Sequence, residues 1–376
     1  GNLLRDYGFF DGHVTWKIDS TKNERAVKLS YDIDMGRPYR IDTLLYEGFA
    51  PRTDSLIHAR SSERLVHTDD YFNVNTLNAE RQRVVDLLRN HGYYYARTDF
   101  LTFLADTLMR PGYVMLKMVP AANLPKEALK TYHIGKTAVY LTGYNGEPPV
   151  DSMKLRDFTV FYAGDKPGLR FDVLRKRFLY RKGELYSQTR QDYTQEALSR
   201  LGVFKFNEMQ YLPRSGEDTL DVRVNAMFDL PYDSELELNV TTKSTKQTGP
   251  GAIFKLTKKN FRRMGASLNL ELKGSYEWQT SSTVDGDKSV MNSYELGAAL
   301  SLDFPRIVIP WVRNRIDPFR FPSETHFRIY AEQVNRARYF KMLSFGGSIS
   351  YSFQKSRSMK HTVTPVHLAF NHFQRR

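Results

Sequence analysis

The stretch Ala266–Thr280, with the sequence ASLNLELKGSYEWQT, carries the pattern on which the fold prediction depends. Its apolar residues fall at every second position, as at Leu268, Leu270 and Leu272, and polar residues fill many of the positions between them. Successive side chains of a strand point to opposite faces, so this alternation predicts a strand with one apolar and one polar face. The run exceeds the roughly 5–6 residues of a common soluble strand and suits a tilted membrane strand of about 9–11 residues or more.

The same alternation continues on both sides of this stretch. From about Asp233 onward helical periodicity is absent, and a short basic connection, Lys258–Met264, is followed by a longer one, Gln279–Ser289. Short inner turns and longer outer loops are typical of membrane barrels. The pattern therefore favours a transmembrane antiparallel β-barrel over a soluble β-sandwich. The predicted strands are Ser234–Lys243, Gly251–Lys258, Ala266–Thr280, Tyr294–Phe304, Thr325–Val334, Leu343–Phe353 and Val363–Phe373.

The number of predicted strands indicates only part of a barrel. The sequence contains about seven of them, whereas bacterial single-chain barrels have an even number of strands and leave no open edge. We therefore expect residues 231–376 to form the N-terminal part of a larger transmembrane barrel.

The composition is compatible with this prediction and excludes other classes of protein. Hydrophobic residues make up 41% of the 376 residues, and no run approaches the roughly 18–20 apolar residues that a spanning helix needs, which excludes a helix-bundle transporter. The chain has no cysteine, which excludes disulfide scaffolds, cysteine-ligated metal sites and cysteine nucleophiles. Aromatic residues reach 13%, as expected of a β-rich or membrane-interface protein.

Upstream of the predicted barrel, one unit occurs three times. Each copy has a helix end, then a glycine at position 8, 92 or 202, then two strand-like runs. Such a glycine is the expected left-handed cap of a helix, because a residue with a Cβ resists that conformation. An opening strand and a first helix precede this segment in the second and third copies, at Ile41–Tyr46 and Asp54–Val66, and at Ala138–Gly143 and Asp172–Tyr180.

The predicted unit is therefore β-α-α-β-β. We expect the end of one such domain at 1–38 and complete domains at 39–122 and 133–230. Asn75 is the expected N-cap of the second helix in the second copy. The apolar face of this helix carries Leu77, Val84, Val85, Leu87 and Leu88.

This order of elements resembles the Omp85 superfamily and its BamA/TamA family, in which periplasmic POTRA domains precede an outer-membrane barrel of sixteen strands. The resemblance is carried by the repeats, especially Tyr193–Phe204, and by the start of the predicted barrel at Gly249–Gly251 and Asn260–Gly265. Two hallmarks of the family, an arginine-containing motif of an inward-folded loop and a closing C-terminal strand, are not found in the sequence.

Further segments resemble one branch of this family. Phe304–Arg306, Ile309–Trp311 and Ser348–Phe353 are similar to the branch found in Bacteroidetes. Leu236–Gly251 and Leu272–Gln279 are most similar to its TamA-like lipoprotein type, TamL.

The resemblance implies a factor that assembles or translocates outer-membrane proteins, with its barrel in the bacterial outer membrane and its POTRA domains in the periplasm. The second strand of each repeat is a candidate edge for an incoming client strand. The first barrel strand would form one side of a lateral gate. The implied client-binding residues are Leu236, Leu238, Asn239, Val240 and Thr241.

The implied partners are nascent outer-membrane proteins, TamB-like or BAM accessory subunits, and outer-membrane lipid including LPS, but no nucleic acid. Three alternatives stay open at this point. They are an essential BamA-like insertase, a secretion or solute pore with periplasmic domains, and a soluble β-rich binding protein.

The charge of the chain suggests a contact with lipid. Lysine and arginine number 55 against 42 acidic residues, a net charge of +13. Solvated faces of the repeats are the simplest explanation, and a sharper hypothesis concerns one predicted periplasmic turn. Basic residues beside aromatic ones can hold anionic headgroups and fix the depth of a barrel. The predicted membrane-interface residues are Arg306, Trp311, Arg313, Arg315 and Phe319.

No motif of the sequence indicates catalysis. The nine histidines are scattered, and none lies in an H-E-x-x-H arrangement. A G-x-S-x-G nucleophile elbow and a G-x-x-x-x-G-K-[ST] phosphate loop are also missing from the sequence. We expect no enzymatic activity, no cofactor and no metal site.

Overall fold

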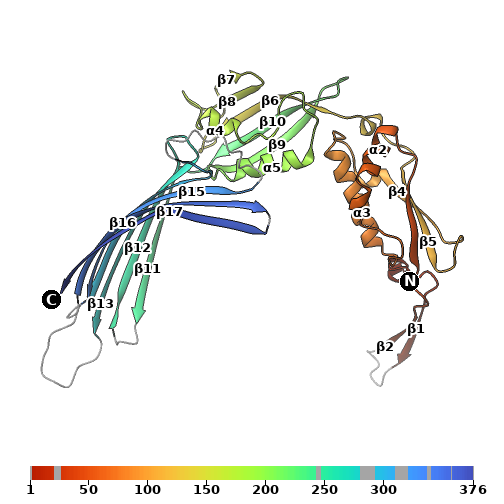
Figure 1. The fold of residues 1–376 in the computed structure, drawn as a ribbon, viewed down its shortest axis with the longest axis horizontal. Coiled ribbons are helices and arrows are strands. Elements are labelled where there is room, and N and C mark those ends of the chain that lie inside the picture. The colour runs from red at the N-terminus through yellow and green to blue at the C-terminus, as the bar shows by residue number, and fades with distance from the viewer. Residues whose placement is uncertain are drawn as a thin grey trace. The chain divides into compact units, whose positions relative to one another are not determined.

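The fold is described from a computed structural model (Figure 1). The residues described are 2–20, 27–242, 247–279, 293–309, 321–336, 340–356 and 358–375. The chain divides into two compact units, which are treated separately. The first unit comprises Gly1–Ile134, Gly183–Thr189 and Arg214–Leu220, and the second comprises Gly135–Lys182, Arg190–Pro213 and Asp221–Arg376. The domain limits expected from the repeats remain predictions.

The first repeat contributes a helix end and a hairpin. Helix α1 (Asn2–Asp6) is followed by strands β1 (His13–Ser20) and β2 (Val27–Asp34), which pair antiparallel. Gly8 lies between helix and hairpin with φ 83°, and Gly92 and Gly202 have φ 99° and 62° in the later repeats. The left-handed glycine caps are therefore confirmed.

The second repeat has the predicted β-α-α-β-β order. Strand β3 runs parallel to β5, and β4 pairs antiparallel with β5 at the edge of the sheet. Leu77, Val84 and Val85 of α3 are buried with the sheet, as the apolar pattern predicts, and Leu87 packs against this core from a partly buried position. The elements are β3 (Arg40–Tyr46), α2 (Pro51–Ala59), α3 (Val74–Arg89), β4 (Leu101–Asp106) and β5 (Tyr113–Pro120), with short 3₁₀ turns η1 (Ser61–Glu63), η2 (Thr98–Phe100) and η3 (Lys126–Leu129).

Two details of this repeat differ from the prediction. The first helix ends at Ala59 instead of Val66, and η1 follows it, because serines favour local turns over a helix interior. The N-cap of α3 is Asn73 instead of Asn75. The Asn73 side chain accepts a hydrogen bond of 2.8 Å from the backbone N–H of Asn75, which already lies in the first helical turn.

The third repeat contains a hairpin that the sequence did not predict. Its strand order is β7-β8-β6-β10-β9, so the hairpin β7–β8 extends the sheet beyond the opening strand. The first helix covers only Phe171–Arg175, because Phe178 and Tyr180, expected in the helix, turn inward and are buried beside Phe158. The elements are β6 (His133–Thr142), β7 (Asp151–Leu155), β8 (Phe158–Tyr162), α4 (Phe171–Arg175), α5 (Gln188–Ser199), β9 (Phe204–Pro213) and β10 (Thr219–Phe228).

A sheet of seven antiparallel strands follows, in chain order from β11 to β17. Every predicted strand of this region is present, and most extend a few residues further than predicted. The repeats and this long sheet confirm the predicted fold class, with a barrel only partly covered by the chain. The strands are β11 (Tyr232–Thr242), β12 (Gln247–Phe261), β13 (Ala266–Gln279), β14 (Ser293–Phe304), β15 (Ser323–Arg336), β16 (Phe340–Ser356) and β17 (Met359–Arg375).

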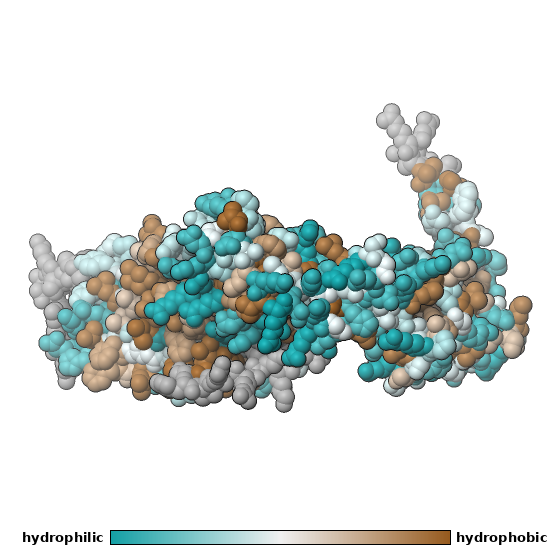
Figure 2. All heavy atoms as spheres, turned by 90° about the horizontal axis from the view of Figure 1, so that it is seen from above, coloured by the Kyte–Doolittle hydropathy of each residue, from teal (hydrophilic) through white to brown (hydrophobic). Residues whose placement is uncertain are grey.

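The register gives this sheet one continuous apolar face. Residues directly opposite each other in neighbouring strands share a face, and one such row crosses the whole sheet without a polar side chain. Many apolar side chains of this face are exposed, and Figure 2 shows brown, hydrophobic residues at the surface of the molecule. The row consists of Leu236, Phe254, Leu272, Ala298, Ala331, Phe345 and Phe370.

The opposite face of the sheet carries a network of charges. Lys273 lies between two carboxylates, at 2.7 Å from Glu295 and 3.2 Å from Glu332. Three further basic residues of this face each have an acidic partner, in the pairs Lys255–Glu235 at 3.3 Å, Arg328–Glu271 at 3.4 Å and Arg336–Glu277 at 3.1 Å. The sheet therefore has the two-sided character that the alternation predicts. Within the described ranges, no helix has the length and apolar character needed to cross a bilayer.

Candidate strand-pairing edges and the junction beside them

Strand β11 forms one edge of the seven-stranded sheet. In the described part of the chain it pairs with β12 alone, and β17 at the opposite edge pairs with β16 alone. The outer side of an edge strand presents unpaired N–H and C=O groups that can template another strand. Figure 1 shows β11 and β12 as long neighbouring arrows.

The five predicted client-binding residues all lie on β11 and point to both faces of it. Leu236, Leu238 and Val240 lie on the apolar face and are 64%, 74% and 74% exposed. Asn239 and Thr241 lie on the polar face, where they line a hollow of about 270 Å³. The structure thus places these residues on the first strand of the sheet, which pairs with β12 alone within the described residues, and their role in client binding remains a prediction.

Glycines of β12 create the hollow beside Asn239 and Thr241. A Cβ at Gly251 would lie 2.3 Å from Oδ1 of Asn239, and a Cβ at Gly249 would lie 1.7 Å from the carbonyl oxygen of Tyr276. Both distances are far below van der Waals contact. At Gly249 the obstacle is backbone, so only glycine fits there, whereas at Gly251 a larger residue would have to displace the Asn239 side chain. The Gly249–Gly251 segment, which carries part of the family resemblance, therefore has a steric reason.

Side-chain contacts hold both ends of β11 to β12. At the end where β11 begins, Lys255 pairs with Glu235 at 3.3 Å and the Lys258 ammonium lies 5.2 Å from the centre of the Tyr232 ring. At the other end, the hydroxyl of Thr248 donates to that of Thr242 at 3.3 Å. The pairing of β11 with β12 continues past Pro250, whereas the pairing between β12 and β13 is interrupted there.

The repeats also place their second strands at sheet edges. Strand β4 ends the order β3-β5-β4, and β9 ends the order β7-β8-β6-β10-β9. In the third repeat the hairpin β7–β8 covers the opening strand β6, whose counterpart β3 in the second repeat pairs with β5 alone among the described strands. The second strand is thus at an edge in both complete repeats, and the long β9 is the larger of the two edges.

The turn between β12 and β13 has an unusual backbone. Asn260, Arg262 and Arg263 have φ of 54°, 52° and 60°, and Gly265 has φ 67°. Residues with a Cβ rarely adopt this left-handed region. The Asn260 side chain accepts a hydrogen bond of 3.1 Å from the N–H of Gly265, which closes the turn.

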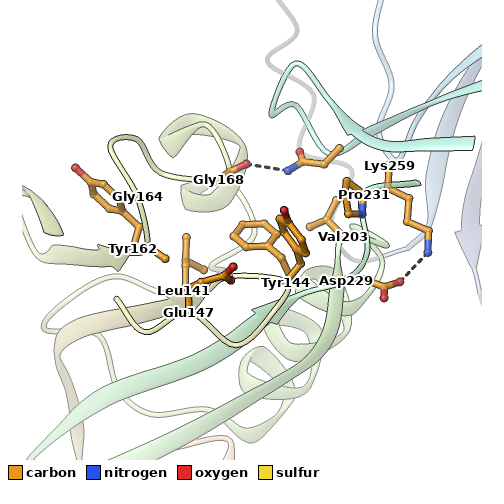
Figure 3. Close-up of a pocket in the computed structure, with 14 residues that line it drawn as sticks. Leu141, Tyr144, Glu147, Tyr162, Gly164, Gly168, Val203, Asp229, Pro231 and Lys259 are labelled. Atoms are coloured by element: carbon orange, nitrogen blue, oxygen red, sulfur yellow. Dashed lines mark hydrogen bonds and ion pairs between the residues drawn. The ribbon is translucent and has the colours of Figure 1, made fainter. Parts of the chain in front are cut away.

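Contacts with the loop before α4 hold this turn in place. The Asn260 amide donates to the carbonyl of Gly168 at 2.8 Å, as Figure 3 shows. The backbone N–H of Arg170 donates to the carbonyl of Arg263 at 2.9 Å. Two side-chain contacts complete the set, from Arg170 Nε to the Arg262 carbonyl at 3.2 Å and from Arg263 Nη1 to the Pro167 carbonyl at 3.3 Å.

A buried arginine makes a second contact between the repeat and the sheet. Arg177 is 5% exposed, and its guanidinium donates to the carbonyl of Pro305 at 3.1 Å. Burial, with the nearby charges of Arg306 and Arg200, lowers the pKa of Arg177 to about 10. Burial also lowers the pKa of Arg306 from its ordinary value. Of the predicted membrane-interface residues, Arg306 is thus half-buried near the repeat, while Trp311, Arg313, Arg315 and Phe319 lie outside the described residues.

A cavity of about 400 Å³ lies at the same junction (Figure 3). Its wall is mostly apolar, with Leu141, Tyr144, Val203 and Pro231 among the lining residues. Lys259 forms an ion pair of 2.7 Å with Asp229 on one side, and this hydrogen bond holds the pKa of Asp229 below its ordinary value. The sequence analysis did not predict this cavity. Part of its wall is formed by the end of β8 and the residues directly after it, and β8 was not predicted.

The described residues contain no group of three or more histidine or acidic side chains arranged to hold a metal ion.

No protein-family model and no curated protein matches the sequence. Among solved structures the chain is similar to BamA from Haemophilus ducreyi lacking POTRA domains 1–3, with 13% identity over 88% of this chain and 64% of that chain and a TM-score of 0.45. It is also similar to Haemophilus influenzae BamA POTRA3–5, with 14% identity over 60% and 76% and a TM-score of 0.33. CdiB from Acinetobacter baumannii matches with 9% identity over 89% and 63% and a TM-score of 0.32. The chain thus spans less than two thirds of the BamA structure named first.

Proposed function

We propose that this chain belongs to an outer-membrane factor of the TamA/BamA type, nearest to TamL, which assembles or translocates β-barrel proteins. The observation that carries the proposal is the order of elements, in which β-α-α-β-β repeats with edge strands β4 and β9 precede a long antiparallel sheet whose one face is apolar and exposed. A membrane strand with a free edge leaves polar backbone groups that lipid cannot satisfy. A client strand that pairs with β11 would satisfy them.

The mechanism follows from the two faces of β11. An incoming strand would continue the antiparallel ladder and place its own apolar side chains beside Leu236, Leu238 and Val240. Asn239 and Thr241 would meet its polar side chains on the other face. Main-chain pairing of this kind tolerates client strands of different sequence. The free energy comes from pairing and burial of the client, so no nucleotide and no catalytic group is required.

The repeats would hold clients before they reach the sheet. Strands β4 and β9 lie at sheet edges, and an extended peptide can add to such an edge through main-chain hydrogen bonds, which tolerate many sequences. This arrangement suits nascent outer-membrane proteins as clients, with the repeats in the periplasm. TamB-like or BAM accessory subunits and outer-membrane lipid including LPS are the further partners in this proposal.

Crosslinking between single cysteines tests the proposal, and the chain offers a clean background because it has no cysteine. We expect Leu238→Cys in the native protein to form a disulfide with a cysteine in a client strand during assembly. The matched control is Ile329→Cys on the interior strand β15, which is paired on both sides, and its side chain is also exposed on the apolar face, at 61% against 74% for Leu238. Absence of a crosslink at Leu238, or equal crosslinking at both positions, would contradict pairing at the β11 edge.

A secretion or solute pore is the second candidate function. The charged face of the sheet supports it, because the paired lysines, arginines and glutamates suit a water-filled lumen. Ion conductance with defined selectivity, without any effect of depletion on other barrel proteins, would favour this candidate over assembly.

A further inference from the structure

The basic residues of the seven-stranded sheet fall into two groups with different partners. On the polar face, Lys255, Lys273 and Arg328 each contact a carboxylate at 2.7–3.4 Å. At the end of the sheet where β11 begins, Lys258 and Arg262 have no carboxylate within ion-pair distance among the described residues, and neither has Arg306. Asp172 attracts Arg306 from beyond that distance, and Arg170 repels it.

Each of these three cations lies beside an aromatic ring. The Lys258 ammonium is 5.2 Å from the centre of the Tyr232 ring, and the Arg262 guanidinium is 5.7 Å from that of Phe261. The Arg306 guanidinium is 6.0 Å from the Phe304 ring. We call Lys258, Arg262 and Arg306 the rim cations. An aromatic ring keeps a cation in place without neutralising its charge.

The rim cations lie where the apolar face of the sheet ends. Tyr232 opposes Lys258, and Lys258 opposes Leu268 in the next strand, so all three share that face. Phe304 ends β14 on the same face, two residues beyond Leu302. Arg262 belongs to the short turn that joins β12 to β13. Apolar surface, aromatic rings and unpaired positive charge thus follow one another at this end.

We infer that the rim cations bind the phosphate groups of anionic phospholipids at the membrane surface next to the last repeat. This inference rests on the proposed function insofar as the sheet must lie in a bilayer. Aromatic and basic residues gather at the level of lipid headgroups, because a ring suits the boundary between hydrocarbon and water and a cation attracts the phosphate. The charges that the protein leaves without a carboxylate are then neutralised by the lipid.

The experiment compares lipids in the native, detergent-purified protein. Short-chain phosphatidylglycerol is titrated and its retention is measured by native mass spectrometry, with phosphatidylcholine of the same chain length and inorganic phosphate as the other two arms. We expect phosphatidylglycerol to be retained preferentially and inorganic phosphate not to displace it. Displacement by inorganic phosphate alone would overturn the lipid as the source of the phosphate group.

The variants locate the site. Lys258→Gln, Arg262→Gln and Arg306→Gln together should remove the preference for phosphatidylglycerol, at about fivefold for each charge lost. The matched control removes three exposed charges of the third repeat by Lys154→Gln, Arg156→Gln and Lys166→Gln, and should keep the preference. Equal losses in both triple variants would overturn the inference. Arg262→Gln alone, which changes an exposed turn side chain, serves if the triple variant does not fold.

A separate measurement keeps the two proposals apart. Insertion of the wild-type protein into phosphatidylcholine vesicles, followed by resistance to alkaline extraction, tests the membrane sheet of the proposed function. Insertion without any preference for phosphatidylglycerol would overturn the lipid site alone. Failure to insert into vesicles of either composition would overturn the membrane sheet, and the lipid site with it.

Discussion

Strands β5 and β11 both carry apolar residues at every second position, but the surroundings of these residues are opposite. In β5 the apolar positions Val114, Leu116 and Met118 are each 0% exposed, because α2 and α3 cover that face of the sheet. In β11 the apolar positions are 64–74% exposed, and no helix covers them among the described residues. Alternation therefore tells which side chains share a face, whereas the other elements that pack on the sheet decide whether protein or another apolar medium covers that face.

The largest expected change in stability comes from shortening an apolar side chain that is buried by other parts of the protein. Leu116→Ala should destabilise the second repeat by about 2–5 kcal/mol, because a buried leucine leaves a cavity that its neighbours fill only in part. Hydrogen exchange of the β5 amides measures this change as faster opening. Leu238→Ala on the exposed face of β11 should leave exchange of the β5 amides unchanged. Similar effects of both variants would break the comparison.

The next largest change in stability is expected from a charge on the apolar face of the long sheet, which lipid would contact. Ile329→Arg lies on the apolar face of β15 and should cost about 2–4 kcal/mol near the bilayer midplane. Asn371→Arg, on the polar face of β17 and exposed, should change stability little. Urea unfolding of the vesicle-inserted protein, followed by its mobility on a gel, compares the two variants. An equally mild effect of Ile329→Arg would show that this face is in contact with water.

The smallest effect concerns the helix that covers β5. Asn73→Ala should destabilise α3 by about 1 kcal/mol, since the side chain caps the helix. Asn75→Ala should have little effect, because only the backbone N–H of this residue takes part in the cap. Hydrogen exchange in the first turn of α3 distinguishes the two residues. A larger destabilisation by Asn75→Ala than by Asn73→Ala would show that Asn75 is the N-cap, as the sequence predicted.

The strands of the long sheet could be predicted because each depends on its own residues. The strand β13 can be predicted from its own alternating residues, Leu268, Leu270 and Leu272, without knowledge of its neighbours. The register follows once neighbouring strands pair. The short hairpin β7–β8 escaped prediction because Asp151–Leu155 is brief and mostly exposed, without a clear alternation of faces. Local patterns thus predicted the long elements and missed the short ones that neighbours stabilise.

The candidate site could be predicted only in part, for a similar reason. The residues of β11 were accessible to sequence reasoning, since they form the first alternating run after the repeats. Outside the candidate site, the burial of Glu80 on the apolar face of α3 was not accessible, because it depends on Arg83 and Tyr46, which contact it at 2.6 Å and 2.5 Å. Burial raises the pKa of Glu80, but these hydrogen bonds and that from the N–H of Leu65 outweigh burial and lower it.

The turn between β12 and β13 also has a mechanical consequence. The covalent link from the third repeat to the sheet is the short segment Asp229–Pro231, whereas the docked turn adds four hydrogen bonds to the loop before α4. A pulling force on the repeat would be shared by these bonds in parallel and delivered to β12, the neighbour of β11. Tension on the third repeat would therefore reach the sheet at β12, beside the strand on which the proposed client would pair.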